Sequence, residues 1–125
     1  MQLQVRDIKN MTGIDQRLQK IISETAKVID IELPGYGFIV TCGLRTIEEQ
    51  KILVSKGLSK TMNSYHLTGK AFDIAVKKNG VVTWDIKEYK TISVLFKKVA
   101  KAQGIELTWG GDWKTFVDGP HFQIN

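Results

Sequence analysis

The chain contains only two histidines, His66 and His121, and both lie in segments that suit metal ligands. His66 stands in a loop-like stretch, and Asp73 follows it in a run of alternating side chains that predicts a strand. Side chains of a strand point alternately to its two faces, so Asp73 shares one face with small residues while larger apolar residues take the other. The small residues are Ala71 and Ala75, and the apolar ones are Phe72, Ile74 and Val76. A carboxylate among alanines has room beside it for a ligand.

His121 begins a second strand-like run, in which apolar residues alternate with His121 and Gln123. His121 therefore also points away from the apolar face of its strand. If the two strands are neighbours, Asp73 and His121 lie side by side and His66 completes the site from its loop. Two histidines and one carboxylate leave the fourth position of a tetrahedral zinc site open, which is the pattern of a catalytic site rather than a structural one.

On spacing alone, these three residues can also have ordinary structural roles. An isolated histidine in a small domain is commonly a surface residue or a hydrogen-bonded core residue, and an aspartate in a strand can simply pair with a lysine. The arrangement of one histidine near an aspartate, with the second histidine far along the chain, is not one of the short helical motifs that identify zinc by themselves.

Three segments have the apolar periodicity of helices. They cover residues 14–29, 47–56 and 86–102. Thr12 and Asp15 resemble a capping box for the first helix, with aspartate in place of the usual glutamate. Thr46 with Glu49 has the same pattern before the second helix, and Asp85 begins the third. These helices must support the strands that carry the candidate ligands.

Short runs with strand character lie between and after the helices, at residues 36–42, 71–76, 81–84, 106–109 and 121–124. The second and third runs are joined by residues 77–80, which end in Asn-Gly and predict a two-residue hairpin turn. Helices mixed with hairpin-linked strands indicate an α+β fold. We expect a small antiparallel sheet with flanking helices, not a doubly wound parallel sheet.

At 125 residues the chain is expected to form one domain that covers residues 1–125. Its net charge is +5, but the lysines are scattered, so the sequence predicts no nucleic-acid partner and only a general attraction to anionic polymers such as the bacterial envelope.

No apolar run is long enough to span a membrane, and residues 1–6 lack the apolar stretch of a secretory signal. Cys42, the single cysteine, is expected to be a buried strand residue rather than a nucleophile.

The stretch from Ser64 to Asp73, Ser-x-His-x-x-Gly-x-Ala-x-Asp, is similar to the signature of the D-alanyl-D-alanine carboxypeptidase (VanY-like) group of metallopeptidases. Within that group, the chain most resembles the L-alanyl-D-glutamate endopeptidases of bacteriophage lysins and some Bacillus wall hydrolases. The resemblance covers residues 36–125. Its other motifs are Gly43-Leu-Arg-Thr-Ile-Glu-Glu-Gln50, Lys56-Gly-Leu-Ser-Lys60, and Trp109-Gly-Gly-Asp-Trp113 followed by Phe116-Val-Asp-Gly-Pro-His-Phe-Gln123. The resemblance implies the zinc-peptidase fold that this group shares with the amino-terminal signalling domain of hedgehog proteins.

The resemblance also implies roles for individual residues. The implied zinc ligands are His66, Asp73 and His121. Asp118 is the implied catalytic base, and a carboxylate just before a ligand, across a Gly-Pro turn, can reach the attacking water without binding the metal. Arg45 and Ser64 are implied to contact substrate, Arg45 by binding a carboxylate or by polarising the scissile carbonyl. The role of Asp112 stays open at this point: it could be a hydrogen-bond partner of a ligand histidine, or it could replace Asp118 as the base.

The implied activity is hydrolysis of the L-alanyl-D-glutamate bond in the peptidoglycan stem by a phage or prophage endolysin. Such an enzyme is expected to be a monomer, made in the host cytoplasm without a signal peptide, that acts on the wall after release and does not insert stably into a membrane. One alternative is a D-alanyl-D-alanine carboxypeptidase or dipeptidase of the same fold. Another is a non-catalytic, zinc-containing wall-binding module, against which the presence of Asp118 and Arg45 argues.

Overall fold

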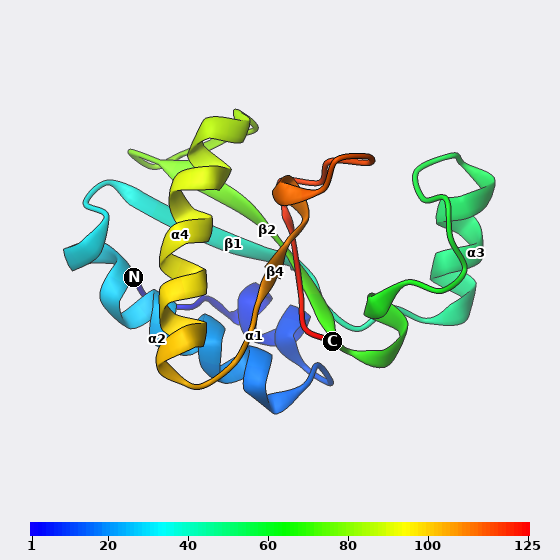
Figure 1. Ribbon diagram of the computed structural model, residues 1–125, viewed down its shortest axis with the longest axis horizontal. Coiled ribbons are helices and arrows are strands. Elements are labelled where there is room, and N and C mark those ends of the chain that lie inside the picture. Colours follow the sequence, from blue (N-terminus) through cyan, green and yellow to red (C-terminus); the bar gives the residue numbers. More distant parts are fainter.

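The computed structural model describes residues 1–125 and has the α+β architecture that the sequence predicts (Figure 1). The strands are β1 (Tyr36–Cys42), β2 (Ala71–Lys78), β3 (Val81–Thr83), β4 (Thr108–Trp109) and β5 (His121–Gln123). The helices are α1 (Val5–Met11), α2 (Gln16–Glu32), α3 (Ile47–Ser55) and α4 (Ile86–Ala102), with 3-10 turns η1 (Tyr65–Thr68) and η2 (Gly110–Asp112). The sheet is antiparallel, with strand order β1-β2-β5-β4 and β3 paired to β2. None of the helices combines the length and apolar character needed to cross a membrane.

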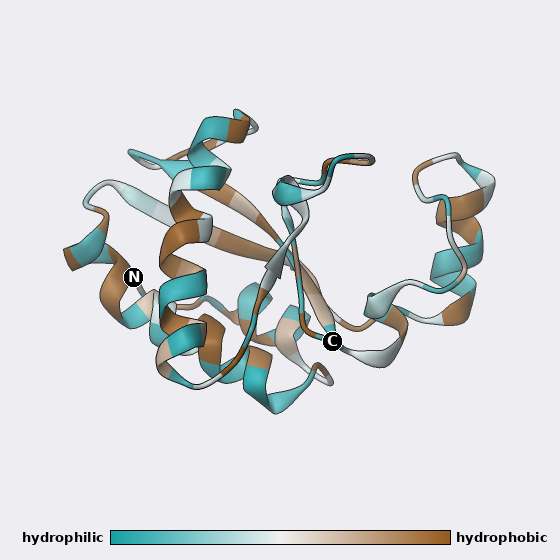
Figure 2. Cartoon of the chain, in the orientation of Figure 1, coloured by the Kyte–Doolittle hydropathy of each residue, from teal (hydrophilic) through white to brown (hydrophobic).

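Two long amphipathic helices, α2 and α4, pack against each other and against the central strands. Figure 2 shows apolar and polar residues alternating along both helices, and their apolar sides join the strands in a core of 21 buried residues. Within this core Phe122 stacks on Phe72, with ring centroids 5.2 Å apart, and lies 4.9 Å from Phe96 of α4. Aromatic rings bury large apolar areas, so this cluster stabilises the pairing of β5 with β2 on the side opposite the candidate ligands.

Helix α1 is absent from the predicted elements, and it covers the outer edge of the sheet. Its buried Asp7 accepts a hydrogen bond from the amide of Val40 (2.9 Å), and Asn10 donates one to the carbonyl of Val40 (2.9 Å). Because β1 is an edge strand, these backbone groups have no neighbouring strand on that side. Polar side chains of α1 therefore form the hydrogen bonds that another strand would otherwise make with the backbone groups of this edge.

One predicted helix start is wrong. Helix α2 begins at Gln16 and runs to residue 32, and Asp15 caps it by accepting a hydrogen bond from the backbone. Thr12 takes no part in a capping box with Asp15. It ends α1 instead, and its hydroxyl donates to the carbonyl of Ile8 (3.0 Å). The prediction failed because the residues before Asp15 belong to a helix that the sequence pattern did not reveal.

The other local signals are confirmed. Thr46 and Glu49 form a capping box at the start of α3, with both hydrogen bonds at 3.1 Å. Asp85 caps α4, which covers the predicted range. Asn79 and Gly80 in the β2–β3 turn both have positive φ, of 51° and 82°, as a type I′ hairpin turn requires.

We predict that Asp7→Ala lowers the free energy of unfolding by about 2–3 kcal/mol, because it leaves the buried amide of Val40 without a hydrogen-bond acceptor. Urea unfolding of both proteins measures the difference. The matched control is Glu24→Ala, which removes an exposed ion pair with Lys27 and should change stability by less than about 0.5 kcal/mol. Equal effects of the two substitutions would show that α1 does not stabilise the sheet edge.

Candidate metal centre and cleft

The pairing of β2 with β5 places two of the predicted ligands directly opposite each other. Asp73 and His121 are register partners, and Nδ1 of His121 lies 3.0 Å from Oδ1 of Asp73. Both side chains lie on the face of the sheet away from Phe72 and Phe122, which are completely buried. Strand alternation and antiparallel register thus bring a carboxylate and an imidazole together.

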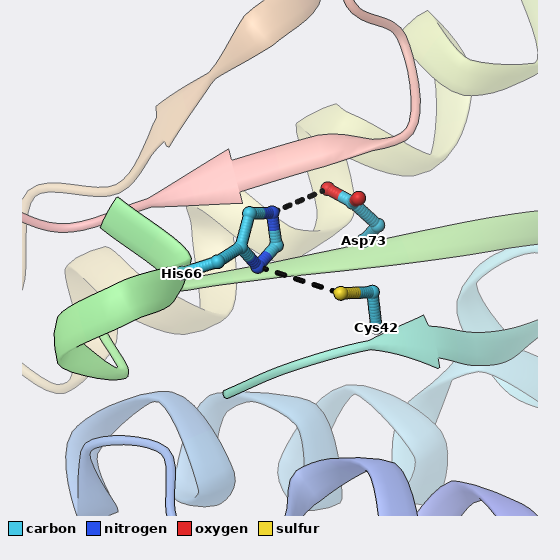
Figure 3. A group of neighbouring side chains, drawn as sticks. All are labelled: Cys42, His66 and Asp73. Atoms are coloured by element: carbon cyan, nitrogen blue, oxygen red, sulfur yellow. Dashed lines mark hydrogen bonds and ion pairs between the residues drawn. The ribbon is translucent and has the colours of Figure 1, made fainter. Parts of the chain in front are cut away.

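His66 reaches the same carboxylate from the turn η1, which precedes β2. Ser64 caps this turn by accepting a hydrogen bond from the amide of His66 (3.2 Å), and Gly69 ends it with a φ of 70°. Nε2 of His66 lies 3.2 Å from Oδ1 of Asp73. A dashed line in Figure 3 marks this contact. The structure therefore brings all three predicted ligands to one oxygen atom, on side chains that are largely buried.

Each histidine has a second partner that orients its ring. Nδ1 of His66 donates to the carbonyl of Gly43 (2.8 Å), and Nε2 of His121 donates to Oε1 of Gln123 (2.7 Å). These bonds leave Nε2 of His66 and Nδ1 of His121 directed at Asp73. Donors on a tetrahedral zinc ion at about 2.0–2.1 Å lie roughly 3.3 Å from one another, close to the separations seen here. The donor types, spacing and oriented rings fit a zinc ion.

Charge in this cluster is balanced by close pairing. Burial opposes a charged imidazole, but the hydrogen bonds to Asp73 and Cys42 and the charge of Asp73 together outweigh it and raise the pKa of His66 to about 10. Burial likewise opposes ionised Asp73, yet hydrogen bonds from His121 and His66 hold the pKa of that carboxyl well below its usual range. A bound cation would take the place of the imidazole proton as the partner of the Asp73 carboxylate.

Cys42 ends β1, as expected for a strand residue, but it is half-buried beside this site and not buried as the sequence predicted. The pairing of β1 with β2 shifts register between Val40 and Cys42, and such an irregularity re-aims the side chains that follow it. Its sulfur lies 3.8 Å from Nδ1 of His66. In Figure 3 the His66 ring lies between Cys42 and Asp73 and turns a different nitrogen to each. Cys42 therefore faces the nitrogen that already donates to Gly43.

Asp118 lies next to the ligand cluster, on the loop that leads into β5. One carboxylate oxygen of Asp118 and one donor atom each of Asp73 and His121 all lie within 4.8 Å of one another. Burial raises the pKa of the Asp118 carboxyl, and the charge of Asp73 raises it further, against the opposing charges of the two histidines and Arg45. A carboxyl with a raised pKa is suited to both accept and return a proton.

The Gly-Gly pair after β4 makes room for this loop. A Cβ atom on Gly110 would lie 2.4 Å from the carbonyl oxygen of Asp118 and 3.1 Å from Cβ of His121. The amide of Asp118 donates to the carbonyl of Gly110 (3.0 Å), so the two segments touch backbone to backbone. Gly110 is therefore required for close approach of two backbones.

Arg45 also belongs to the site, and it is fixed by a residue that the sequence patterns did not single out. Its Nη1 donates to Oε1 of Gln50 (2.8 Å), and its Nη2 lies 3.4 Å from the sulfur of Cys42. Gln50 is completely buried and also donates to Ser59 (2.8 Å) and to the carbonyl of Thr61 (2.5 Å). A buried glutamine in a short helix has no periodic signature, and Gln50 appeared in the sequence only as the last residue of the Gly43–Gln50 motif, with no role of its own.

These residues line one cleft of about 760 Å³. The three predicted ligands and Asp118 line it together with Arg45, Ser64, residues 57–61 and Asn63. Trp113 faces His121, with ring centroids 5.2 Å apart, whereas Trp109 is a core residue. A cleft of this size next to a metal site can admit a short peptide.

Asp112 has neither of the two roles predicted for it. Its carboxylate is exposed and forms an ion pair with Lys97 of α4. It does not line the cleft, and the ligand histidines have Gly43 and Gln123 as their second partners.

Comparison with known sequences gives a consistent result. A family model described as phage L-alanyl-D-glutamate peptidase matches residues 1–124. The peptidoglycan L-alanyl-D-glutamate endopeptidase CwlK of Bacillus subtilis is 34% identical over an alignment 125 positions long, which covers 86% of this chain and 73% of CwlK. The L-alanyl-D-glutamate peptidase of Listeria phage A118 is 35% identical over 118 residues. That match covers 94% of this chain, which spans only 41% of the length of the Listeria phage protein.

Solved structures agree with the fold. The L-Ala D-Glu endopeptidase ChiX of Serratia marcescens superposes with a TM-score of 0.86 at 35% identity, covering 100% of this chain and 90% of ChiX. The vancomycin resistance D,D-pentapeptidase VanY, solved with Zn(II), has a TM-score of 0.60 at 17% identity over 89% of this chain and 72% of VanY. The VanY likeness extends to the fold and no further. From the family match over nearly the whole sequence and the close relatives, the chain belongs to the phage L-alanyl-D-glutamate peptidase family.

Proposed function

We propose that this chain is a zinc-dependent endopeptidase that hydrolyses the L-alanyl-D-glutamate bond of peptidoglycan stem peptides. The proposed ligands are His66, Asp73 and His121, and the proposed base is Asp118. The observation that carries the proposal is the convergence of two oriented imidazole nitrogens on one carboxylate oxygen, at 3.0 and 3.2 Å, at the end of a peptide-sized cleft. The choice of bond is supported by family membership and by the relatives named for that activity.

Zinc and Asp118 have separate roles in the proposed reaction. Zinc, when bound, acts as a Lewis acid and lowers the pKa of a coordinated water towards about 7. Asp118, whose own pKa is raised by burial, accepts the proton of the attacking water. It then returns that proton to the amine of D-glutamate as the peptide bond breaks. Because Asp118 is placed by the backbone contact with Gly110, it needs no rearrangement to lie beside the ligands.

Arg45 and Ser64 are the proposed substrate-binding residues. Arg45 is held against Gln50, and its remaining donors can bind a substrate carboxylate or the scissile carbonyl oxygen as negative charge develops on it. Ser64 lines the cleft, although its hydroxyl oxygen already accepts a hydrogen bond from His66. Its O–H remains available to donate to a peptide carbonyl.

The biological setting is proposed with the activity. Residues 1–125 act as one catalytic domain and as a monomer. The enzyme is made in the host cytoplasm and acts on the wall as an endolysin after release. The relatives named as phage peptidases support this setting.

We predict that removing the metal by dialysis against a chelator abolishes hydrolysis of peptidoglycan, and that about one equivalent of zinc restores it. Because zinc binds the folded state, the metal-free protein should also melt at a lower temperature than the zinc-loaded protein. Turbidity loss of a wall suspension, metal analysis and thermal melting measure these effects. Full activity in a verified metal-free preparation would contradict the proposal.

We predict that Asp118→Asn lowers the rate of wall hydrolysis by at least about a hundredfold while zinc content stays unchanged, because the amide cannot accept the proton. Asp112→Asn is the matched control, since Asp112 lies on the same segment but pairs with Lys97 at the surface. That control should retain activity within about twofold. If the two variants are equally active, Asp118 is not the base.

A further inference from the structure

Neither cation that lines the cleft, Arg45 or Lys60, has an anionic partner. Lys60 lies on the loop after α3 and lines the cleft, yet none of the ion pairs in the structure includes it. Its Nζ atom instead lies 4.2 Å from the centre of the Phe116 ring, on the opposite wall. Figure 1 shows these two segments, the loop after α3 and the loop before β5, facing each other. A contact with an aromatic face satisfies an ammonium group weakly where both side chains are exposed.

The backbone keeps Phe116 in this position. Its φ is 51°, in the left-handed region that a large side chain rarely adopts, and its side chain is exposed rather than turned into the core. Phe116 lies two residues before Asp118 in the same loop, and both line the cleft. The contact of Lys60 with Phe116 therefore joins the loop after α3 to the loop that carries the proposed base.

The distribution of charge along the cleft suits a negatively charged substrate group near Lys60. The only acidic residues that line the cleft are Asp73 and Asp118, both at the metal end. Within residues 57–63, the cleft is lined by a glycine, a leucine, two hydroxyl side chains, one amide side chain and the ammonium of Lys60. Arg45, the other cation that lines the cleft, donates to the neutral amide of Gln50 and keeps further donors for the substrate. Lys60 is exposed and is the only cation among residues 57–63, so it can meet an anion that enters from solvent along this part of the cleft.

We propose that Lys60 is a specificity-determining residue that binds the free α-carboxylate of D-glutamate in the stem peptide. This inference rests on the proposed function. In the stem, D-glutamate continues through its side-chain carboxyl group, so its α-carboxylate is free and lies next to the scissile nitrogen. On binding, the ammonium of Lys60 leaves the Phe116 ring for the carboxylate, which is a stronger partner. The enzyme then favours stems with D-glutamate over stems in which this carboxylate is amidated to D-isoglutamine.

The test compares two synthetic peptides, acetyl-L-alanyl-γ-D-glutamyl-L-lysine amide and its D-isoglutamine counterpart. The D-glutamate α-carboxylate is the only carboxylate in the pair. For the zinc-loaded enzyme, Lys60→Met should lower kcat/KM for the acid peptide about tenfold, mainly through KM, because a charge-assisted contact is lost. It should leave kcat/KM for the amide peptide unchanged. Lys60→Arg should restore the preference, and Phe116→Leu should keep it, because both retain the cation.

Lys56→Met is the matched charge control, since Lys56 is exposed at the end of α3 and does not line the cleft. Lys56→Met should leave the ratio of kcat/KM for the acid peptide to kcat/KM for the amide peptide the same as in the wild type. If Lys60→Met lowers kcat/KM equally for both peptides, or leaves the ratio of the two kcat/KM values unchanged, Lys60 does not bind the carboxylate and the inference is overturned.

A binding measurement separates this inference from the proposed function. In the Asp118→Asn background, calorimetry gives the dissociation constant of each peptide with and without Lys60→Met. If Lys60→Met weakens binding of the acid peptide but not of the amide peptide, the role of Lys60 is supported. If Lys60→Met leaves the dissociation constant of the acid peptide unchanged, the role is overturned. Absence of hydrolysis by the wild-type enzyme would count against the proposed function and not against this result.

Discussion

The short contacts of one carboxylate oxygen with two imidazole nitrogens are the interaction on which the site depends. Oδ1 of Asp73 lies 3.2 Å from Nε2 of His66 and 3.0 Å from Nδ1 of His121. A buried carboxylate is costly unless it is paired, so the cluster requires either protonated imidazole or a cation in it. The three residues come from a turn and two strands, and the sheet register decides whether they meet. A shift of β5 by one residue would turn His121 into the core.

The rest of the fold secures that register. On the other face of the sheet, Phe72 and Phe122 stack directly behind the ligands, so the same strand pairing that buries the aromatic rings aligns Asp73 with His121. Glycines give the backbone its close contacts around the site. Gly43 supplies the carbonyl that orients His66, and a Cβ there would lie 2.1 Å from the carbonyl oxygen of Asn10 in α1. The edge helix α1 thus also helps to position His66 in the candidate metal centre.

The parts predicted from sequence are those with a local or periodic signal. Strand alternation placed Asp73 and His121 on the correct face, Asn-Gly marked the hairpin, and side-chain caps marked the starts of α3 and α4. Helix α1 has no such signal, because its main contacts with the sheet are made by polar side chains that satisfy an edge. Cys42 was misplaced because a register irregularity in β1 cannot be read from alternation, and Gln50 was overlooked because its bonds join segments far apart in sequence. The roles of the site residues rest on resemblance and geometry together.

The identity of the bond that is cut tests the proposed activity most directly. Purified peptidoglycan is incubated with the zinc-loaded enzyme, and the products are labelled at their new amino termini and identified by mass spectrometry. We expect new amino-terminal D-glutamate, with L-alanine left attached to the glycan, and no such product from the metal-free protein. Release of free D-alanine without new D-glutamate termini would contradict the proposed activity and would assign the site to D-alanyl-D-alanine hydrolysis.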